Sequence, residues 1–212
     1  MDNKHLILVG GGGHCKSVIE IAEKVGYTIL GILDLPNNLG EKILGHEIIG
    51  IDDEMVDFVA RAKFLVTVGH MKNASLRISL HEKITAVEGK LATIVAHTSQ
   101  VSRYAQIGDG SVIMHCAIVN AGASIGRGCI INTLANIEHD VIIGDYCHVS
   151  TGAMINGDCS IGRDTFIGSQ AVLVNGIHIC EGAVVAAGAV VKNSIFHRGI
   201  YAGNPACLKR EF

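Results

Sequence analysis

A period of six residues dominates the second half of the sequence. A Val, Ile or Leu stands at every sixth position from Val95 to Val191 without insertion, and a small residue follows most of these positions four residues later. The period fits neither the 3.6-residue repeat of a helix nor the two-residue alternation of a hairpin sheet. It is the hexapeptide signature of a parallel β-helix, in which three hexads form one triangular coil.

The hexads predict which side chains lie inside this prism. The aliphatic residue points inward, where burial of a Val or Ile contributes about 1.5–3 kcal/mol. Pairs such as Gly108-Asp109, Gly126-Arg127, Asn156-Gly157 and Gly162-Arg163 are expected at the corners, which require backbone angles that glycine adopts easily. Residues 93–196 are therefore expected to form a β-helical domain, with residues 197–212 as a tail that leaves the prism.

Composition and charge exclude several classes of protein. Aromatic residues are 4%, Trp is absent and there are 26 Gly, which suits an aliphatic prism with glycine corners. A net charge of −3 without a basic cluster argues against nucleic acid as a partner. No apolar run approaches the roughly 20 residues of a membrane span, and the N-terminus enters a strand directly rather than forming a signal peptide.

The cysteines and histidines do not indicate disulfides or a metal. None of the seven Cys forms a C-x-x-C pair, and Cys129, Cys147 and Cys159 occupy small inward positions, where Cys acts as a compact hydrophobe. No His pair has metal-ligand spacing with supporting carboxylates and thiols. We therefore expect a reduced, cytoplasmic protein without a metal.

The N-terminal part, residues 1–92, has the pattern of a small α/β domain. Strands are expected at 5–9, 28–33 and 64–68, a short helix at 53–60, and an amphipathic helix capped at its start at 73–88. Between the first two strands, residues 10–13 are all Gly and a helix follows, an arrangement that suits an anion at the helix start. Asp34 lies about 20 residues after this loop, where a ribose-binding carboxylate would be.

This Gly-rich turn is an imperfect dinucleotide fingerprint. The third Gly position holds Cys15, and the unit is short for a full dinucleotide domain, so an NAD-dependent enzyme is disfavoured. Glycines that merely form a tight turn remain an alternative. Four consecutive glycines exceed what a turn needs, so we favour a ligand that approaches the backbone.

The candidate catalytic pair is His139-Asp140. Ile137 points inward, so His139 lies outside the core, and the next residue is a carboxylate able to orient an imidazole and raise its basicity. Gly157 follows one coil later and leaves a groove beside the imidazole, and His148 lies half a coil away. The alternative, that His139 is an ordinary exposed corner residue, stays open on spacing alone.

The whole chain resembles the bacterial sugar acetyltransferases of the PglD/NeuD type. The resemblance rests on GGGGHCK at 10–16, Ile-Leu-Asp at 32–34, Val-Gly at 68–69, Ile-Glu-His-Asp at 137–140, HVSTGA at 148–153 and YAGNPA at 201–206. It implies a Rossmann-like domain joined to a left-handed β-helix, acetyl-CoA as co-substrate, and a homotrimer with acetyl-CoA between adjacent prisms. The left hand of the helix comes from the resemblance alone.

The resemblance also implies roles for individual residues. His139 would be the general base and Asp140 the carboxylate that raises its basicity. Contacts with acetyl-CoA are implied for His148, Gly157, Ser169 and Ala187, and contacts with a nucleotide-sugar for Gly13, His14, Cys15, Asp34 and Gly69. Cys15 replaces a Gly that is common in the family's loop, and Cys207 stands where Lys usually follows the GNPA motif.

The sequence therefore predicts acetyl-CoA-dependent N-acetylation of a nucleotide-linked aminosugar. The amine must lose a proton before it attacks a thioester, which a histidine base can accept. No Ser or Cys nucleophile linked to a base is evident, which favours direct attack. Two alternatives stay open: O-acetylation of a sialic-acid-type sugar, and a non-catalytic solenoid that binds a sugar nucleotide.

Overall fold

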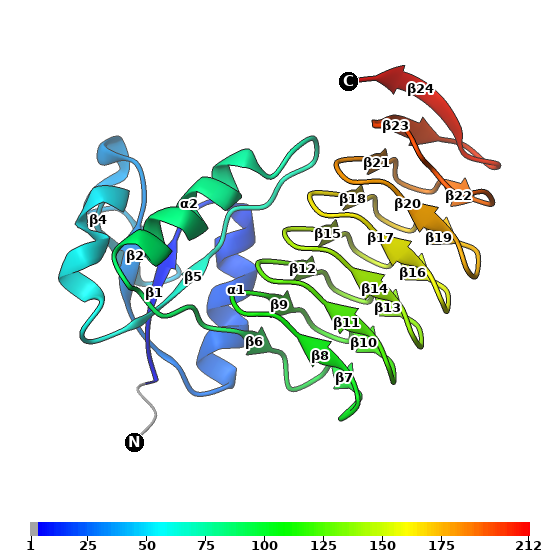
Figure 1. Cartoon of the computed structure of the whole chain (residues 1–212). Helices are drawn as coiled ribbons and strands as arrows, with labels where there is room; N and C mark the ends of the chain where they lie inside the picture. Colours follow the sequence, from blue (N-terminus) through cyan, green and yellow to red (C-terminus); the bar gives the residue numbers. More distant parts are fainter. Residues whose placement is uncertain (1–3) are drawn as a thin grey trace.

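The computed structural model describes residues 4–212 and contains an α/β region beside a long prism (Figure 1). The strands expected at 5–9 and 28–33 are confirmed, whereas residues 1–3 of the expected N-terminal lead lie outside the described part. The α/β region contains β1 (His5–Val9), α1 (Gly13–Lys24), β2 (Thr28–Leu33), the 3₁₀ turn η1 (Pro36–Asn38), β3 (Lys42–Ile43), β4 (His46–Gly50), the 3₁₀ helix η2 (Asp52–Phe58), β5 (Lys63–Val66) and α2 (Ser75–Ala86).

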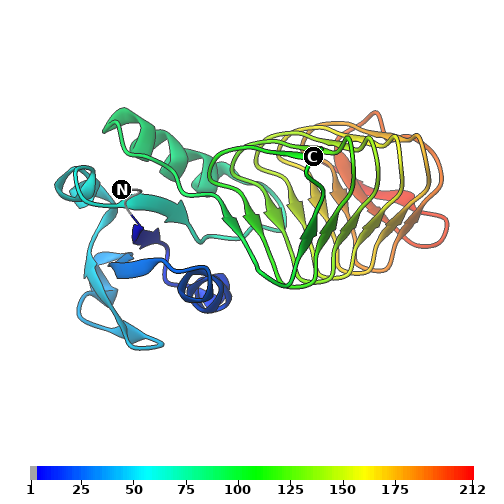
Figure 2. The same ribbon diagram turned by 90° about the horizontal axis from the view of Figure 1, so that it is seen from below.

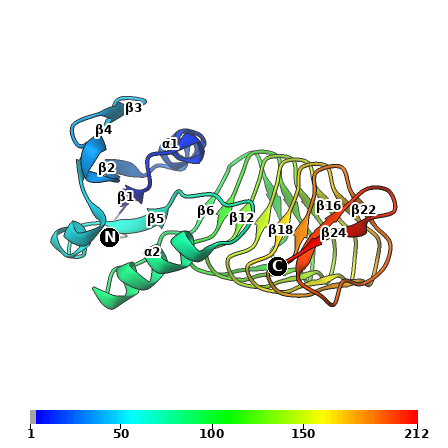
Figure 3. The ribbon, with the colours of Figure 1, turned by 90° about the horizontal axis from the view of Figure 1, so that it is seen from above.

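One five-stranded sheet, in the order β3-β4-β2-β1-β5, organises the α/β region. The order is parallel except for the β3–β4 hairpin. α1 buries one face of the sheet, and α2 and η2 bury the other (Figure 3). α2 is shorter than expected and its N-cap residue, Ala74, provides no side-chain cap.

The prism is built from two-residue strands in three stacked parallel sheets (Figure 2). We call the sheets the first side (β6, β9, β12, β15, β18, β21), the second side (β7, β10, β13, β16, β19, β22) and the third side (β8, β11, β14, β17, β20), in the order in which the chain visits them. The first corner joins the first side to the second, the second corner joins the second side to the third, and the third corner closes the coil. This is the expected left-handed β-helix.

The strands are as follows: β6 (Ile94–Val95), β7 (Gln100–Val101), β8 (Gln106–Ile107), β9 (Val112–Ile113), β10 (Ile118–Val119), β11 (Ser124–Ile125), β12 (Ile130–Ile131), β13 (Asn136–Ile137), β14 (Ile142–Ile143), β15 (His148–Val149), β16 (Met154–Ile155), β17 (Ser160–Ile161), β18 (Phe166–Ile167), β19 (Val172–Leu173), β20 (His178–Ile179), β21 (Val184–Val185) and β22 (Val190–Val191). The second residue of each pair is the inward aliphatic, and these residues form one continuous core with the small residues of the hexads.

The corners use glycine differently from the expectation. Positive φ recurs every sixth residue, three positions after the inward one, and both Gly110 and Asp140 occupy this register. Gly108 and Gly126 are not among the positive-φ residues. They lie where neighbouring coils approach closely, since a Cβ on Gly108 would be 2.6 Å from the backbone nitrogen of Arg127. Close approach, rather than unusual backbone angles, explains these glycines.

The C-terminal residues remain on the prism, contrary to the expected exit. β23 (Gly199–Ala202) pairs in parallel with β21 and extends the first side by one strand. β24 (Cys207–Glu211) then pairs antiparallel with β23. The chain therefore ends in a hairpin that continues the first side.

The α/β region lies against the first side of the prism. The outward residues Ile94, Val112 and Ile130 on this side are each at most 2% exposed. Val112 packs in the same cluster as residues of α1. No helix in the described residues has the length and apolarity that a membrane span requires.

Candidate active site

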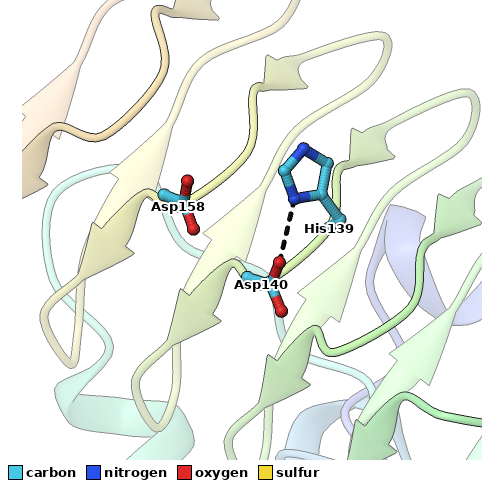
Figure 4. A group of neighbouring side chains, drawn as sticks. All are labelled: His139, Asp140 and Asp158. Carbon is cyan, nitrogen blue, oxygen red and sulfur yellow. Dashed lines mark hydrogen bonds and ion pairs between the residues drawn. The ribbon is translucent and has the colours of Figure 1, made fainter.

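His139 and Asp140 form a hydrogen-bonded pair on the second corner (Figure 4). Nδ1 of His139 donates to Oδ2 of Asp140 at 2.9 Å, and both side chains are more than half exposed. This bond, reinforced by the charges of Asp140, Asp158 and Glu138, raises the pKa of His139 above its ordinary value. With Nδ1 carrying the proton, Nε2 has a lone pair that points away from Asp140 and can accept a proton.

Small residues make room for this pair in the neighbouring coils. The imidazole lies against Gly157, where a Cβ would be 2.5 Å from Nε2 of His139, as the register predicts. Asp140 lies against Gly122, where a Cβ would be 2.2 Å from Oδ1 of Asp140. Asp140 itself has φ +60, a conformation that Asp tolerates better than most residues. The hexad geometry thus builds a niche around the imidazole.

Asp158 joins this pair from the next coil (Figure 4). It has the same corner position as Asp140 and the same φ of +60. The ligand-type atoms of His139, Asp140 and Asp158 lie within 4.8 Å of one another. Exposed acidic groups are common without an ion, so the absence of a metal stays a prediction.

His148 lies on a different side of the prism, facing the α/β region. Its Nδ1 donates to the carbonyl oxygen of His70 at 2.9 Å, and Nε2 is 3.4 Å from Nδ2 of Asn132. Burial, followed by the charge of Arg77, lowers the pKa of His148 to about 3. His148 is therefore neutral, with Nε2 as a hydrogen-bond acceptor. Gly69 is adjacent, since a Cβ there would be 3.7 Å from Cε1 of His148.

The glycine loop lies at the start of α1. A Cβ on Gly12 or Gly13 would meet no heavy atom of the described residues within 4 Å, so this part of the loop faces open space. The first N–H groups of a helix have no acceptor within the helix and suit an anion. Oδ2 of Asp34 accepts from the backbone nitrogen of Gly11 at 2.9 Å, and Oδ1 accepts from that of Leu35 at 2.7 Å. Asp34 therefore fixes the loop to the end of β2.

The two residues after Gly13 differ in their surroundings. Cys15 is fully buried, its backbone nitrogen donates to the carbonyl oxygen of Gly12 at 3.0 Å, and burial raises the pKa of its thiol to about 11. Burial, with a smaller effect of Arg77, lowers the pKa of His14 to about 4. Nε2 of His14 is buried and has no partner among the described residues. The neutral imidazole of His14 thus has Nε2 available beside the loop as a hydrogen-bond donor or acceptor.

Ser169 and Ala187 lie on the first corner in successive coils. The backbone nitrogen of Gly188 donates to the carbonyl of Ser169 at 2.8 Å, and Oγ of Ser169 is 2.9 Å from Oγ of Ser150. Gly157 lies on the second corner. The residues implied for acetyl-CoA therefore divide between the first side, which carries His148, and two corners of one prism.

Buried polar contacts that the motifs do not indicate fix the α/β region to the prism. Oδ1 of Asp164 accepts from the backbone nitrogen of Ala74 at 2.6 Å. Arg77, 1% exposed, donates to the carbonyl oxygens of Tyr146 and Cys147. Sequence reasoning missed both residues because their partners are about 70 to 90 residues away. The position of Asp158, in contrast, follows from adding one coil to Asp140.

One expectation about nucleophiles needs correction. Ser160 is linked to a histidine after all, because its Oγ is 2.9 Å from Nδ1 of His178. The imidazole of His178 stacks on the ring of Phe196. No carboxylate hydrogen-bonds His178 among the described residues, so this pair lacks the third group of a catalytic triad.

Comparisons with known proteins match both parts of the chain. The model of the PglD N-terminal domain matches residues 5–84, and that of the bacterial transferase hexapeptide matches residues 122–157 and 158–193. Curated proteins give no match. The acetyltransferase domain of PglB from Neisseria gonorrhoeae, solved with acetyl coenzyme A, is 32% identical over 98% of this chain and 100% of that one, with a TM-score of 0.92.

A second solved structure is similar over the whole chain. PerB from Caulobacter crescentus, in complex with CoA and GDP-perosamine, is 28% identical over 97% of each chain, with a TM-score of 0.90. WeeI from Acinetobacter baumannii, 22% identical with a TM-score of 0.85 over 96% of this chain and 99% of that one, shares the fold. From these matches and the motifs that carry them, this chain belongs to the PglD-type bacterial sugar acetyltransferases of the hexapeptide-repeat family.

Proposed function

We propose that the protein transfers the acetyl group of acetyl-CoA to the amine of a nucleotide-linked aminosugar. The observation that carries this proposal is the His139–Asp140 pair, whose free Nε2 lies in a niche bounded by Gly157. The likeness to PglB and PerB over nearly the whole chain supports the same chemistry, since acetyl-CoA and GDP-perosamine are bound in those proteins.

His139 acts as the general base. Nε2 takes a proton from the ammonium, and the resulting amine nitrogen attacks the thioester carbonyl carbon. The tetrahedral intermediate then collapses: the carbon–sulfur bond breaks, the nitrogen loses its second proton to solvent, and the thiolate of CoA leaves and takes a proton from the imidazolium. Asp140 keeps the proton on Nδ1 and stabilises the imidazolium that forms. Direct attack is favoured because the Ser160–His178 pair has no orienting carboxylate.

The nucleotide-sugar binds where α1 begins. The backbone N–H groups around Gly12 and Gly13 receive the phosphates, and Gly69 and His14 border the same space. Asp34 contacts the ribose with the lone pairs that Gly11 and Leu35 leave free. Cys15 supports the loop from beneath rather than touching the ligand, because the whole residue is buried and its backbone nitrogen donates to Gly12.

The active form is a homotrimer with acetyl-CoA between adjacent prisms. His139 and Gly157 lie on the second corner, whereas Ser169 and Ala187 lie on the first, so a ligand that touches both sets is best placed between two copies. Apolar side chains of the second side are exposed in the single chain, with Ile118 at 38% and Met154 at 46%. A neighbouring copy would cover this surface.

A CoA-release screen tests this function. Acetyl-CoA is offered with GDP-perosamine, other nucleotide-linked aminosugars and free sialic acids, and the products are analysed by mass spectrometry and NMR. Acetylation of nitrogen is the expected result, and EDTA should leave the rate unchanged. Acetyl transfer to a sialic acid hydroxyl, or no transfer to any acceptor, would contradict the proposal. A monomeric mass by light scattering would contradict the trimer.

A further inference from the structure

The carboxylate of Glu138 is fixed by hydrogen bonds and has no role in the proposed acetyl transfer. It stands between inward-facing Ile137 and His139, at the first position of the second corner. Its Oε2 accepts from Nδ2 of Asn120 and its Oε1 accepts from Nδ2 of Asn136, each at 2.9 Å. Both oxygens are therefore fixed from different positions in the fold.

The two asparagines reach Glu138 from separate directions. Asn120 has the same corner position one coil earlier, and Asn136 begins β13 on the same strand as Ile137. Glu138 is half-buried. Without constraints, its side chain would adopt many rotamers and extend into solvent rather than keep this one position. Two hydrogen bonds from two elements leave the carboxylate little freedom.

These bonds leave the charge of Glu138 uncompensated. An amide donor satisfies an oxygen without neutralising it, and no Lys or Arg among residues 4–212 forms an ion pair with Glu138. Residues 138–140 and 156–158 contain three acidic residues and no Lys or Arg. The surface around His139 is thus anionic, and the charge of Glu138 reaches the imidazole.

Such a surface distinguishes an amine from a hydroxyl. An aminosugar amine is largely an ammonium at neutral pH, and a carboxylate attracts it by charge as well as by hydrogen bonding. A carboxylate has about four acceptor positions, so each oxygen of Glu138 keeps capacity after binding one amide. A neutral hydroxyl gains only the hydrogen bond.

We propose that Glu138 recognises the amine of the acceptor sugar, and that Asn120 and Asn136 are positioning residues that fix its carboxylate beside His139. This inference rests on the proposed function and deepens it, because it assigns the choice of nitrogen over oxygen to one side chain. Glu138 binds the ammonium, and His139 removes the proton that must leave before the nitrogen attacks.

The chain provides a matched control for the asparagines. Asn156 occupies the same corner position one coil after Glu138, but no hydrogen bond joins its side chain to Glu138 among the described residues. Asn156→Leu therefore makes the same change in the same column without disturbing the carboxylate. Differences between it and Asn120→Leu report on the bond to Glu138.

The experiment compares two probes in five proteins. GDP-perosamine and its counterpart with a hydroxyl in place of the amine are titrated by calorimetry in the presence of CoA, so that no turnover is needed. The proteins are the wild type, Glu138→Gln, Asn120→Leu, Asn136→Leu and Asn156→Leu. Kinetics with acetyl-CoA give KM and kcat, and light scattering and melting temperature report on assembly and folding.

We expect the wild type to prefer the amine at least tenfold. Glu138→Gln should weaken binding of the amine about 10- to 100-fold, the usual range for a hydrogen bond to a charged group, and abolish the preference. Asn120→Leu and Asn136→Leu should weaken it about 3- to 10-fold, with kcat nearly unchanged. Asn156→Leu and the affinity of every variant for CoA should match the wild type.

Several outcomes would overturn the assignment. Equal wild-type affinity for amine and hydroxyl, a loss confined to kcat, or equal effects of Asn156→Leu and Asn120→Leu would each contradict amine recognition. Dissociation of the oligomer in Glu138→Gln would place the network in a subunit contact instead. Failure of the wild type to acetylate any aminosugar nucleotide contradicts the proposed function, whereas acetylation without an amine preference contradicts only this inference.

Discussion

Histidines on the second corner of the prism and in or beside the α/β region have opposite electrostatics. His139, on the second corner, is exposed, and its hydrogen bond to Asp140 raises its pKa. For His14, His70 and His81 of the α/β region and His148 of the adjoining first side, burial lowers the pKa: to about 4 for His14 and His81, and to about 3 for His70 and His148. The charge of Arg77 adds to this effect at all four.

This difference in pKa decides which of these histidines can exchange a proton near neutral pH. A base must change protonation state near neutral pH, and among these five histidines only His139 is placed to do so. The buried four stay neutral. The comparison teaches that the surroundings of a histidine, rather than its presence in a motif, decide whether it can exchange a proton near neutral pH.

The largest expected effect comes from removing the exposed base. His139→Ala should lower kcat about 10²- to 10⁴-fold while KM and the affinity for acetyl-CoA change little, because a general base acts in the transition state. Steady-state kinetics and calorimetry measure both. His139 points out of the prism, so the melting temperature should match the wild type. Near-normal turnover, or a loss that follows a drop in melting temperature, would contradict the role of His139.

Acid should lower the stability of the protein through the four buried histidines in and beside the α/β region. Because the four buried histidines have folded pKa values below the ordinary 6.5, the unfolded chain binds protons first as the pH falls. Their contribution to stability is complete above about pH 6.5 and is lost as the pH falls toward 4, by up to about 1.4 kcal/mol per pH unit for each. Denaturant unfolding from pH 7 to 4.5 measures it.

A pair of variants isolates one of these protons. His81 packs against the ring of Tyr146, and both of its nitrogens lack partners among residues 4–212, so His81→Phe should make the dependence on pH shallower by about one proton. His139→Phe should leave the acid side of the curve unchanged. Identical pH slopes for His81→Phe and the wild type would remove the buried histidines as the cause.

The glycine loop provides a test confined to the α/β region. Gly12 has φ −71 and a Cβ there would have open space, so Gly12→Val should fold normally. A side chain in the space proposed for the phosphates should raise KM for the nucleotide-sugar about tenfold, as expected for the loss of one hydrogen bond to a charged group. The affinity for acetyl-CoA should stay constant, and an equal loss of both affinities would contradict two separate half-sites.

The sequence predicted the repeating part of the molecule better than the contacts between its parts. A fixed register places His139 outside the core, Gly157 beside it and the inward aliphatics in one column, because each coil repeats the last. The burial of the outward residues on the first side also has a signal in the sequence. Ile94, Val112 and Ile130 are apolar, each directly precedes an inward residue, and they recur at intervals of one coil. Sequence reasoning did not use that signal.

Other features have no local signature. Arg77 and Asp164 find partners in distant segments, so no spacing rule reveals them. The continuation of the first side by β23 depends on pairing with β21 rather than on the hexad pattern, which ends at Val191. The glycines of the third corner were misread because close approach between coils and positive φ both favour glycine.

The smallest expected effect comes from changing Asp140, which orients the base, while the base His139 is kept. Asp140→Asn keeps a side chain of similar shape and an amide oxygen, but it removes the charge that strengthens the hydrogen bond to Nδ1 and raises the pKa of His139. Activity rises with pH as His139 loses its proton, so a lower pKa should move this acidic limb of the kcat profile to lower pH. At neutral pH, kcat should fall about tenfold, because a weaker base and a less fixed tautomer both slow proton transfer. Asp158→Asn, which removes a charge without a bond to the imidazole, should shift the limb in the same direction but by less. A limb that moves to higher pH in Asp140→Asn, or equal shifts in the two variants, would show that the hydrogen bond does not set the basicity of His139.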